Sequence, residues 1–453
     1  MSKKPKVGMW SGLTAVTAVL TAGAIVGTTV AFHYTTTVNN YLDADTYKII
    51  RGDSDEDTEY FKSDFTSDEE RESYEAELCA QVEAEGAALL KNDNNALPLA
   101  SGAKVSLFGS GSVDTSKAPN FKQALEDQGI QVNSTLWDLY SSDDMMKNYS
   151  RITPAAISDT LEANTQYAVN EAPWSKLSSA ESSFADYGDA AIVVFSRSGG
   201  EGADLSYGEV NYLALDENEK AMLQNVAEMK KNGTVKKTIL LINSANALQV
   251  DFLKNNEYDI DAALWIGDVG ISGINAVAEI LTGKVNPSGS LVDTYCYDNF
   301  SAPAMWNFTP TTYEGYVEGG DVSAKAKSYM IYQEGIYVGY KYYETRYEDF
   351  VTGNGNAGDY AYGDIVAYPF GYGLSYTSYD ISDSYNAADD TYTVTVKVTN
   401  TGDMAGKKTV QVYVQSPYTD YDKENGVEKS AVSLVGFGKT GMIEPGASET
   451  LSM

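Results

Sequence analysis

The sequence contains one histidine, His33, and two cysteines, Cys79 and Cys296, among its 453 residues. Because His33 lies in an apolar N-terminal stretch, the sequence excludes Ser-His-Asp and Cys-His catalysis and a zinc site held by histidines. The cysteines form no Cys-x-x-Cys pair, so we predict neither a metal site nor a cofactor, and spacing assigns no disulfide. We expect both to be small core residues. The chemistry that remains belongs to carboxylates and tyrosines.

Basic residues are also scarce. There are 32 lysines and arginines against 64 acidic residues, which gives a formal net charge of -32. Such a charge repels a phosphate backbone, so no nucleic acid partner is expected. The 34 tyrosines suit a carbohydrate-binding surface, because a phenol offers an apolar face and a polar tip, but they suit an ordinary exposed β surface equally well. The length allows two or three domains.

The N-terminal 34 residues have the pattern of a membrane anchor. Three lysines precede an uncharged apolar stretch over residues 7–34, and a bilayer span needs about 20 residues. A cleaved signal peptide, with Ala22-Gly23-Ala24 as its cleavage site, is the alternative, but apolar regions of such signals are typically about 7–15 residues. We therefore expect an uncleaved single-pass anchor at the cell membrane, with a cytoplasmic N-terminus and the bulk of the chain extracellular. Residues 35–74 are polar and acidic and predict a stalk.

Residues 75–376 alternate between two kinds of pattern. Apolar runs predict strands at 105–112, 131–136, 189–195, 237–243 and 260–267, and helical periodicity predicts helices at 75–90, 121–129, 213–229 and 272–281. This alternation is typical of the α/β class. We predict a three-layer α/β sandwich, in which helices cover both faces of a mostly parallel sheet.

One loop stands out, running from Ser196 to Asp204 directly after the predicted strand 189–195. It places three glycines around Glu201. Ligands bind at the carboxyl ends of strands in open α/β sheets, and glycines let the backbone approach a ligand closely. The alternative is a flexible connection with a solvated carboxylate, and a short glycine-rich pattern leaves both interpretations open.

Several motifs occur in order over about 300 residues. They are Glu85–Asp93 with Leu97-Pro98-Leu99, Arg197–Asp204, Leu264-Trp265 with Gly270 and Gly273, Val285–Gly289, Glu334–Tyr340 and Pro369–Tyr376. Together they resemble the C-terminal α/β-sandwich domain of glycoside hydrolase family 3, which includes many β-glucosidases and β-xylosidases. Residues 377–453, with alternating strands near 391–400 and 410–414, resemble the fibronectin type III-like module that follows in this family.

The resemblance implies a retaining exo-β-glycosidase that hydrolyses terminal β-linked sugars from oligosaccharides or other glycosides. It assigns Glu201 as the general acid/base and Asp204 and Arg197 as substrate-binding residues, with no metal or cofactor. Leu205 stands where the family often has arginine.

The same resemblance places the sugar pocket and the nucleophile on a separate TIM barrel. Nothing before Glu75 has the length to form one, so we expect the barrel beyond residue 453 and a truncated fibronectin-like module. The fold class predicted for the whole chain is thus a transmembrane helix, an α/β sandwich and an incomplete all-β sandwich. A non-catalytic surface module that binds saccharides or holds a partner domain is the alternative function.

Overall fold

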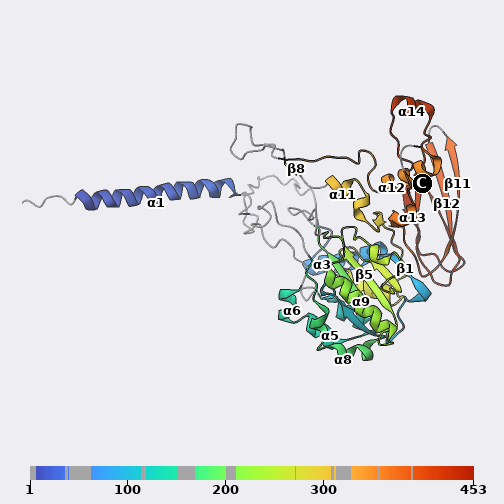
Figure 1. Ribbon diagram of the computed structural model, residues 1–453, viewed down its shortest axis with the longest axis horizontal. Coiled ribbons are helices and arrows are strands. Elements are labelled where there is room, and N and C mark those ends of the chain that lie inside the picture. The colour runs from blue at the N-terminus through green and yellow to red at the C-terminus, as the bar shows by residue number, and fades with distance from the viewer. Residues whose placement is uncertain are drawn as a thin grey trace, which may run out of the picture. The chain divides into compact units, whose positions relative to one another are not determined.

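The computed structural model describes residues 7–35, 39, 63–113, 119–149, 169–199, 211–270, 272–307, 311–312, 328–354, 358–388 and 391–453 (Figure 1). The chain divides into two units, Met1–Asp64 and Phe65–Met453. In the first unit, α1 is a helix over Val7–His33. Within the described residues, no helix combines the length and the apolarity that crossing a membrane requires. The predicted transmembrane helix is therefore not found. Most of the predicted stalk lies outside the described residues.

A six-stranded sheet organises the second unit, in the order β1-β6-β5-β4-β2-β3. The strands are β1 (Ala88–Asn92), β2 (Lys104–Phe108), β3 (Gln131–Val132), β4 (Ala190–Arg197), β5 (Thr238–Ser244) and β6 (Ala262–Trp265). Strands β2 to β6 are mutually parallel, and β1 pairs antiparallel with β6 at one edge. The prediction of a mostly parallel sheet is confirmed.

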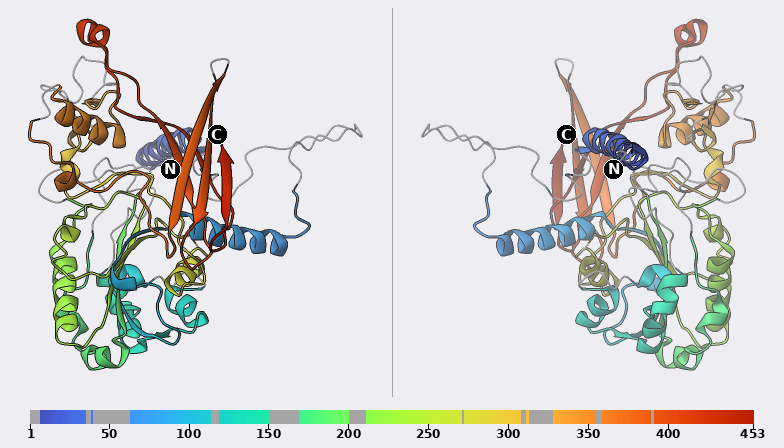
Figure 2. Two further views of the ribbon diagram at one scale, coloured as in Figure 1. Left: turned by 90° about the vertical axis from the view of Figure 1, so that its right-hand side faces the viewer. Right: turned by 90° about the vertical axis from the view of Figure 1, so that its left-hand side faces the viewer.

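Helices cover both faces of this sheet (Figure 2). The helices α4 (Phe121–Asp127) and α10 (Ile274–Leu281) pack on one face, and α5 (Ser134–Tyr140) and α9 (Glu217–Lys231) supply most of the helical packing on the other. Strand β4 serves both sides: Ile192 and Val194 belong to the first core, whereas Val193 and Phe195 belong to the second. Successive side chains of a strand point to opposite faces, so an unbroken apolar run lines both cores.

Two predicted elements are wrong in part. The helix predicted over 75–90 is α3 (Asp68–Gly86), and Ala88–Leu90 instead forms the start of β1. The alanine and leucine pattern suits either structure, and burial between the two cores and pairing with β6 decide for a strand. The strand predicted over 131–136 ends at Val132, because the Asn133 side chain accepts a hydrogen bond from Leu136 N–H and caps α5.

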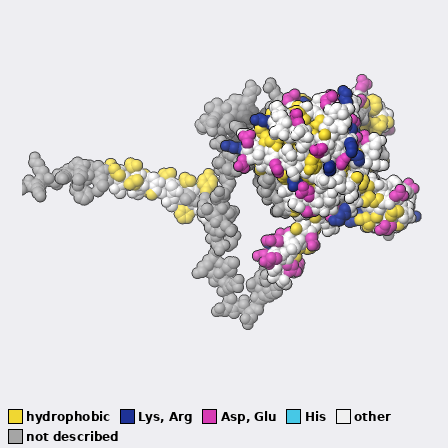
Figure 3. Space-filling model, turned by 90° about the horizontal axis from the view of Figure 1, so that it is seen from below, with side chains coloured by type: hydrophobic (Ala, Val, Ile, Leu, Met, Phe, Trp, Pro, Cys, Tyr) yellow, Lys and Arg dark blue, Asp and Glu magenta, His cyan; other side chains and the backbone are white. Residues whose placement is uncertain are grey.

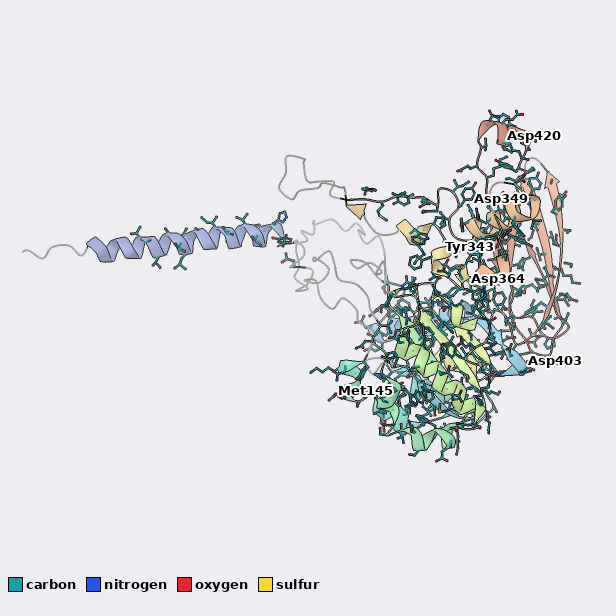
Figure 4. All side chains as sticks on the ribbon, viewed as in Figure 1. Met145, Tyr343, Asp349, Asp364, Asp403 and Asp420 are labelled. Carbon is teal, nitrogen blue, oxygen red and sulfur yellow. The ribbon has the colours of Figure 1, made fainter. Side chains whose placement is uncertain are left out.

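Smaller elements complete the α/β part. They are α6 (Asp143–Asn148), α8 (Glu181–Phe184), β7 (Tyr295–Cys296), α11 (Ala304–Asn307), β8 (Thr311–Thr312), β9 (Ser328–Tyr329), α12 (Tyr340–Thr352), α13 (Tyr362–Ile365), β10 (Val366–Tyr368) and six short 3-10 helices within the described ranges. Strands β7 and β10 pair, and Cys296 is buried there beside Tyr343 of α12, labelled in Figure 4. Cys79 is only half-buried, so it is not the core residue that we expected.

The C-terminal residues form two antiparallel sheets, β11 (Tyr379–Ala388), β12 (Thr391–Asn400) and β15 (Ser448–Ser452) in one, and β13 (Thr409–Val414) and β14 (Ser433–Lys439) in the other. A short helix, α14 (Asp420–Asn425), lies between β13 and β14 in the chain. Valines and Ile443 form the core shared by the sheets. This part is built mainly from antiparallel strands.

Contacts join the all-β part to the α/β part. The Asn286 side chain accepts hydrogen bonds from Tyr376 N–H and Ser375 Oγ and donates to the Ala405 carbonyl oxygen at 3.0 Å. Lys407 pairs with Glu85 at 2.6 Å. Acidic side chains gather along the projecting helix α3 in the view of Figure 3.

Candidate functional site

The order of the strands reverses direction at β2, which makes the carboxyl end of β2 a switch point of the sheet. Strand β3 lies on one side of β2 and β4 on the other, so the connections that follow β2 and β3 run over opposite faces of the sheet. Ligands of open α/β sheets bind outside the carboxyl ends of strands at such a switch point. A cavity of ≈ 310 Å³ lies here, and its polar lining includes Ser110, Ser112, Asn120, Glu171, Ser196 and Asn243. The cavity is large enough for a small organic ligand.

Glu171 precedes the 3-10 helix Trp174–Leu177, and its side chain contacts Ser110 in the loop that follows β2. It is 2% exposed, and its Oε2 accepts hydrogen bonds from Ser110 N–H and Ser110 Oγ, both at 2.8 Å. Its Oε1 accepts from Ala172 N–H at 2.9 Å. Burial raises the pKa of Glu171 to about 7, although these hydrogen bonds oppose the rise. Glu171 thus holds Ser110 at the start of this loop, and its carboxyl group can exchange a proton near neutral pH.

Arg197, the last residue of β4, makes hydrogen bonds with all five of its N–H donors. Nη1 and Nη2 each donate to one carboxylate oxygen of Glu219 at 2.8 Å. Nε donates to the Tyr212 carbonyl oxygen at 2.6 Å, Nη1 to that of Ser196 at 3.0 Å and Nη2 to that of Ala214 at 2.8 Å. Arg197 and Glu219 are 2% and 1% exposed. This is a buried bidentate ion pair with a fully used guanidinium.

Glu219 also lies in the first turn of α9 and takes part in capping it. Its N–H donates to Asp216 Oδ1 at 2.7 Å, and its Oε2 accepts from Asp216 N–H at 2.9 Å, which completes a capping box. Burial raises the pKa of Glu219, and the facing Arg197 opposes that rise. The carboxylate therefore joins the end of β4 to the start of α9.

Tyr212, which follows segment 200–210, is hydrogen-bonded to Ser198, which precedes it. Its hydroxyl accepts a hydrogen bond from Ser198 N–H at 2.6 Å and donates to the Ser198 carbonyl oxygen at 3.1 Å. Its ring faces the Arg197 guanidinium, with the centroid 5.6 Å from Cζ. We call Arg197, Ser198, Tyr212 and Glu219 the clamp. It fixes the chain directly before and after the segment that contains Glu201.

The structure describes one of the three predicted site residues. Glu201 and Asp204 lie outside the described residues. Arg197 is described, and its role in substrate binding stays a prediction. Within the ranges that the structure describes, no group of three or more His, Cys, Asp or Glu side chains could hold a metal ion. We did not predict Glu171, Tyr212 or Glu219, because contacts distant in the sequence make them important. Only the capping box of Glu219 leaves a local pattern.

Comparison with known proteins defines the class. Residues 87–340 match the glycosyl hydrolase family 3 C-terminal domain, so the chain belongs to this family. A beta-glucosidase of Ruminococcus albus is 31% identical over 392 residues, which cover 83% of this chain and 35% of that protein. Beta-glucosidase A of Butyrivibrio fibrisolvens is 32% identical over 416 residues, which cover 83% of this chain and 45% of that protein.

A solved structure agrees with these sequence matches. Beta-glucosidase 3B from Thermotoga neapolitana, in complex with alpha-D-glucose, superposes with a TM-score of 0.64 at 27% identity. The match covers 84% of this chain and 48% of that one. The chain therefore spans between about one third and one half of the length of these relatives.

Proposed function

We propose that this chain supplies the acid/base domain of a retaining exo-β-glycosidase that removes terminal β-linked sugars, as a β-glucosidase does. The supporting observation is the family membership of residues 87–340, combined with the clamp that holds both sides of the Glu201 segment at the carboxyl edge of the sheet. Glu201 is the proposed general acid/base. Asp204, three residues further on, is the proposed substrate-binding residue.

A retaining glycosidase needs two carboxyl groups about 5–5.5 Å apart, one protonated to release the leaving oxygen and one ionised to attack the sugar. Glu201 takes the first role and later acts as the base that activates water. We propose that the nucleophile and the sugar pocket belong to a TIM-barrel domain, which would account for part of the length by which the relatives exceed this chain.

The test compares Glu201→Gln with the parent protein, each combined with a barrel domain, on aryl β-glucosides with good and poor leaving groups. General acid catalysis contributes about 10²–10⁴-fold where the leaving group needs a proton. Glu201→Gln should therefore lose kcat/KM by about that factor on phenyl glucoside and far less on 2,4-dinitrophenyl glucoside. Glu217→Gln is the matched control, because Glu217 lies on the exposed surface of α9. Equal losses on both substrates would contradict the acid role.

We further propose that residues 1–453 alone hydrolyse no glycoside at a useful rate. Gripping and distorting the sugar supplies several kcal/mol, and a lone acid cannot replace it. Turnover by this chain alone that Glu201→Gln abolishes would mean that the site is complete within it. Binding of saccharides without turnover, with or without the barrel, would favour a carbohydrate-binding module.

The location at the cell membrane is a separate proposal. It is supported by the lysines that precede the uncharged segment 7–34. Membrane fractionation with N-terminal sequencing of the mature protein tests it. A soluble product that starts near residue 25 would contradict it and favour a cleaved signal peptide.

A further inference from the structure

We propose that Arg197 is a positioning residue for the general acid Glu201 and does not bind the sugar. The inference rests on the proposed function of Glu201. In this role Arg197 bonds to Glu219 and to the Tyr212 backbone, and it thereby holds the chain directly before and directly after segment 200–210.

The hydrogen bonds of Arg197 argue against a substrate role. A guanidinium has five N–H donors, and all five of Arg197 are already used inside the protein. The side chain is buried, so a sugar hydroxyl would have to displace a carboxylate or a carbonyl oxygen to reach it. Breaking a buried ion pair leaves an uncompensated charge, which is strongly unfavourable.

The choice of arginine follows from the geometry. Two parallel N–H groups meet the two oxygens of Glu219, and the remaining donors reach carbonyl oxygens of Ser196, Tyr212 and Ala214. A lysine has three donors on one nitrogen and cannot reproduce this planar fork. One side chain therefore holds the end of β4, the chain after segment 200–210 and the start of α9 in one arrangement.

The charge of the clamp also suits an acid catalyst. A general acid must hold its proton near neutral pH, and an unpaired guanidinium nearby would favour the ionised form and lower the pKa of that acid. Glu219 cancels the charge of Arg197 with both oxygens. The clamp thus holds the residues directly before and after the segment without adding a net positive charge there.

The experiment uses Arg197→Lys and Tyr212→Phe in the protein combined with its barrel domain, with Glu201→Gln as the reference. Tyr212→Phe is the milder change, because it removes only the hydroxyl that bonds Ser198. A misplacement of about 1 Å can cost 10²-fold in rate. We expect Arg197→Lys to lose about 10²-fold in kcat/KM on phenyl β-glucoside, and Tyr212→Phe to lose less. Both should change little on 2,4-dinitrophenyl β-glucoside, as Glu201→Gln does.

The control is Lys230→Met. Lys230 lies near the opposite end of α9 and pairs with Asp261 at 2.7 Å. Its loss should lower the unfolding temperature without making activity depend on the leaving group. A variant that is only unstable would behave in the same way.

Four results would overturn the inference. A rise in KM that is equal on both substrates in Arg197→Lys would make Arg197 a substrate ligand. If Arg197→Lys does not fold, Tyr212→Phe decides, and the absence of leaving-group dependence in it counts against positioning. If Glu201→Gln itself lacks that dependence, the proposed function fails and the inference fails with it. If Glu201→Gln has it and the clamp variants do not, only the inference fails.

Discussion

Glu171 should make the stability of this protein depend on pH. Its pKa is raised from 4.5 to about 7 by burial, so the folded state holds a proton that the unfolded chain releases. The stabilisation from this proton is fully present below about pH 4.5 and is lost as pH rises toward 7. The difference between these two pKa values corresponds to about 3 kcal/mol.

The test is Glu171→Gln, which keeps the shape of the side chain and cannot ionise. Glutamine has one acceptor oxygen, so one N–H bond, from Ser110 or Ala172, is lost at a cost of about 1 kcal/mol at every pH. We expect the free energy of unfolding of the variant, relative to the parent, to rise by about 3 kcal/mol between pH 4 and pH 8.

Urea denaturation of residues 1–453 at several pH values measures this difference. The comparison with the variant is needed because burial and the nearby Asp268 raise the pKa of Glu83 to about 8, which adds a pH dependence of the same sign to both proteins. Glu181→Gln, on an exposed turn of α8, is the control. A difference between parent and Glu171→Gln that stays constant with pH would show that Glu171 ionises normally and would refute the reasoning.

Three further outcomes are expected. Gly109→Ala should lower the free energy of unfolding in urea by about 1–3 kcal/mol, because its φ is +97° and a Cβ would lie 2.5 Å from the Val194 carbonyl oxygen. Gly129→Ala is the control and should lose less, because its φ is +79° but a Cβ there would meet open space. Asn286→Ala should lose about 1–3 kcal/mol by the same assay, because the Tyr376 N–H loses its acceptor. Glu83→Gln should raise the unfolding temperature at pH 8 and change it little at pH 4.

The sheet could be predicted well from the sequence because its signal is local. Runs such as Ala190–Phe195 are apolar at every position and rich in β-branched residues, which is typical of a strand buried on both faces. The prediction failed for Ala88–Leu90, where a short apolar pattern fits a helix or a strand. Its pairing with β6, which lies far along the chain, decides between them.

The candidate site was harder to predict. The glycine-rich segment around Glu201 was visible in the sequence, but nothing near Glu171 marks it as buried. Its burial follows from the fold, which brings it to Ser110, 61 residues earlier in the chain. The hydroxyl of Tyr212 is likewise important only because Ser198 lies opposite it.

Glu219 has one role that a local sequence pattern predicts and a second role that no local pattern predicts. The spacing Asp216-x-x-Glu219 is a capping box, and it predicts the start of α9 from neighbouring residues alone. The same carboxylate accepts two hydrogen bonds from Arg197, which lies 22 residues earlier, and this second role has no local pattern. Because one carboxylate does both, the start of the helix and the end of β4 cannot shift independently. Arg197 and Glu219 are therefore held together at the carboxyl edge of the sheet, where α/β proteins place their ligands.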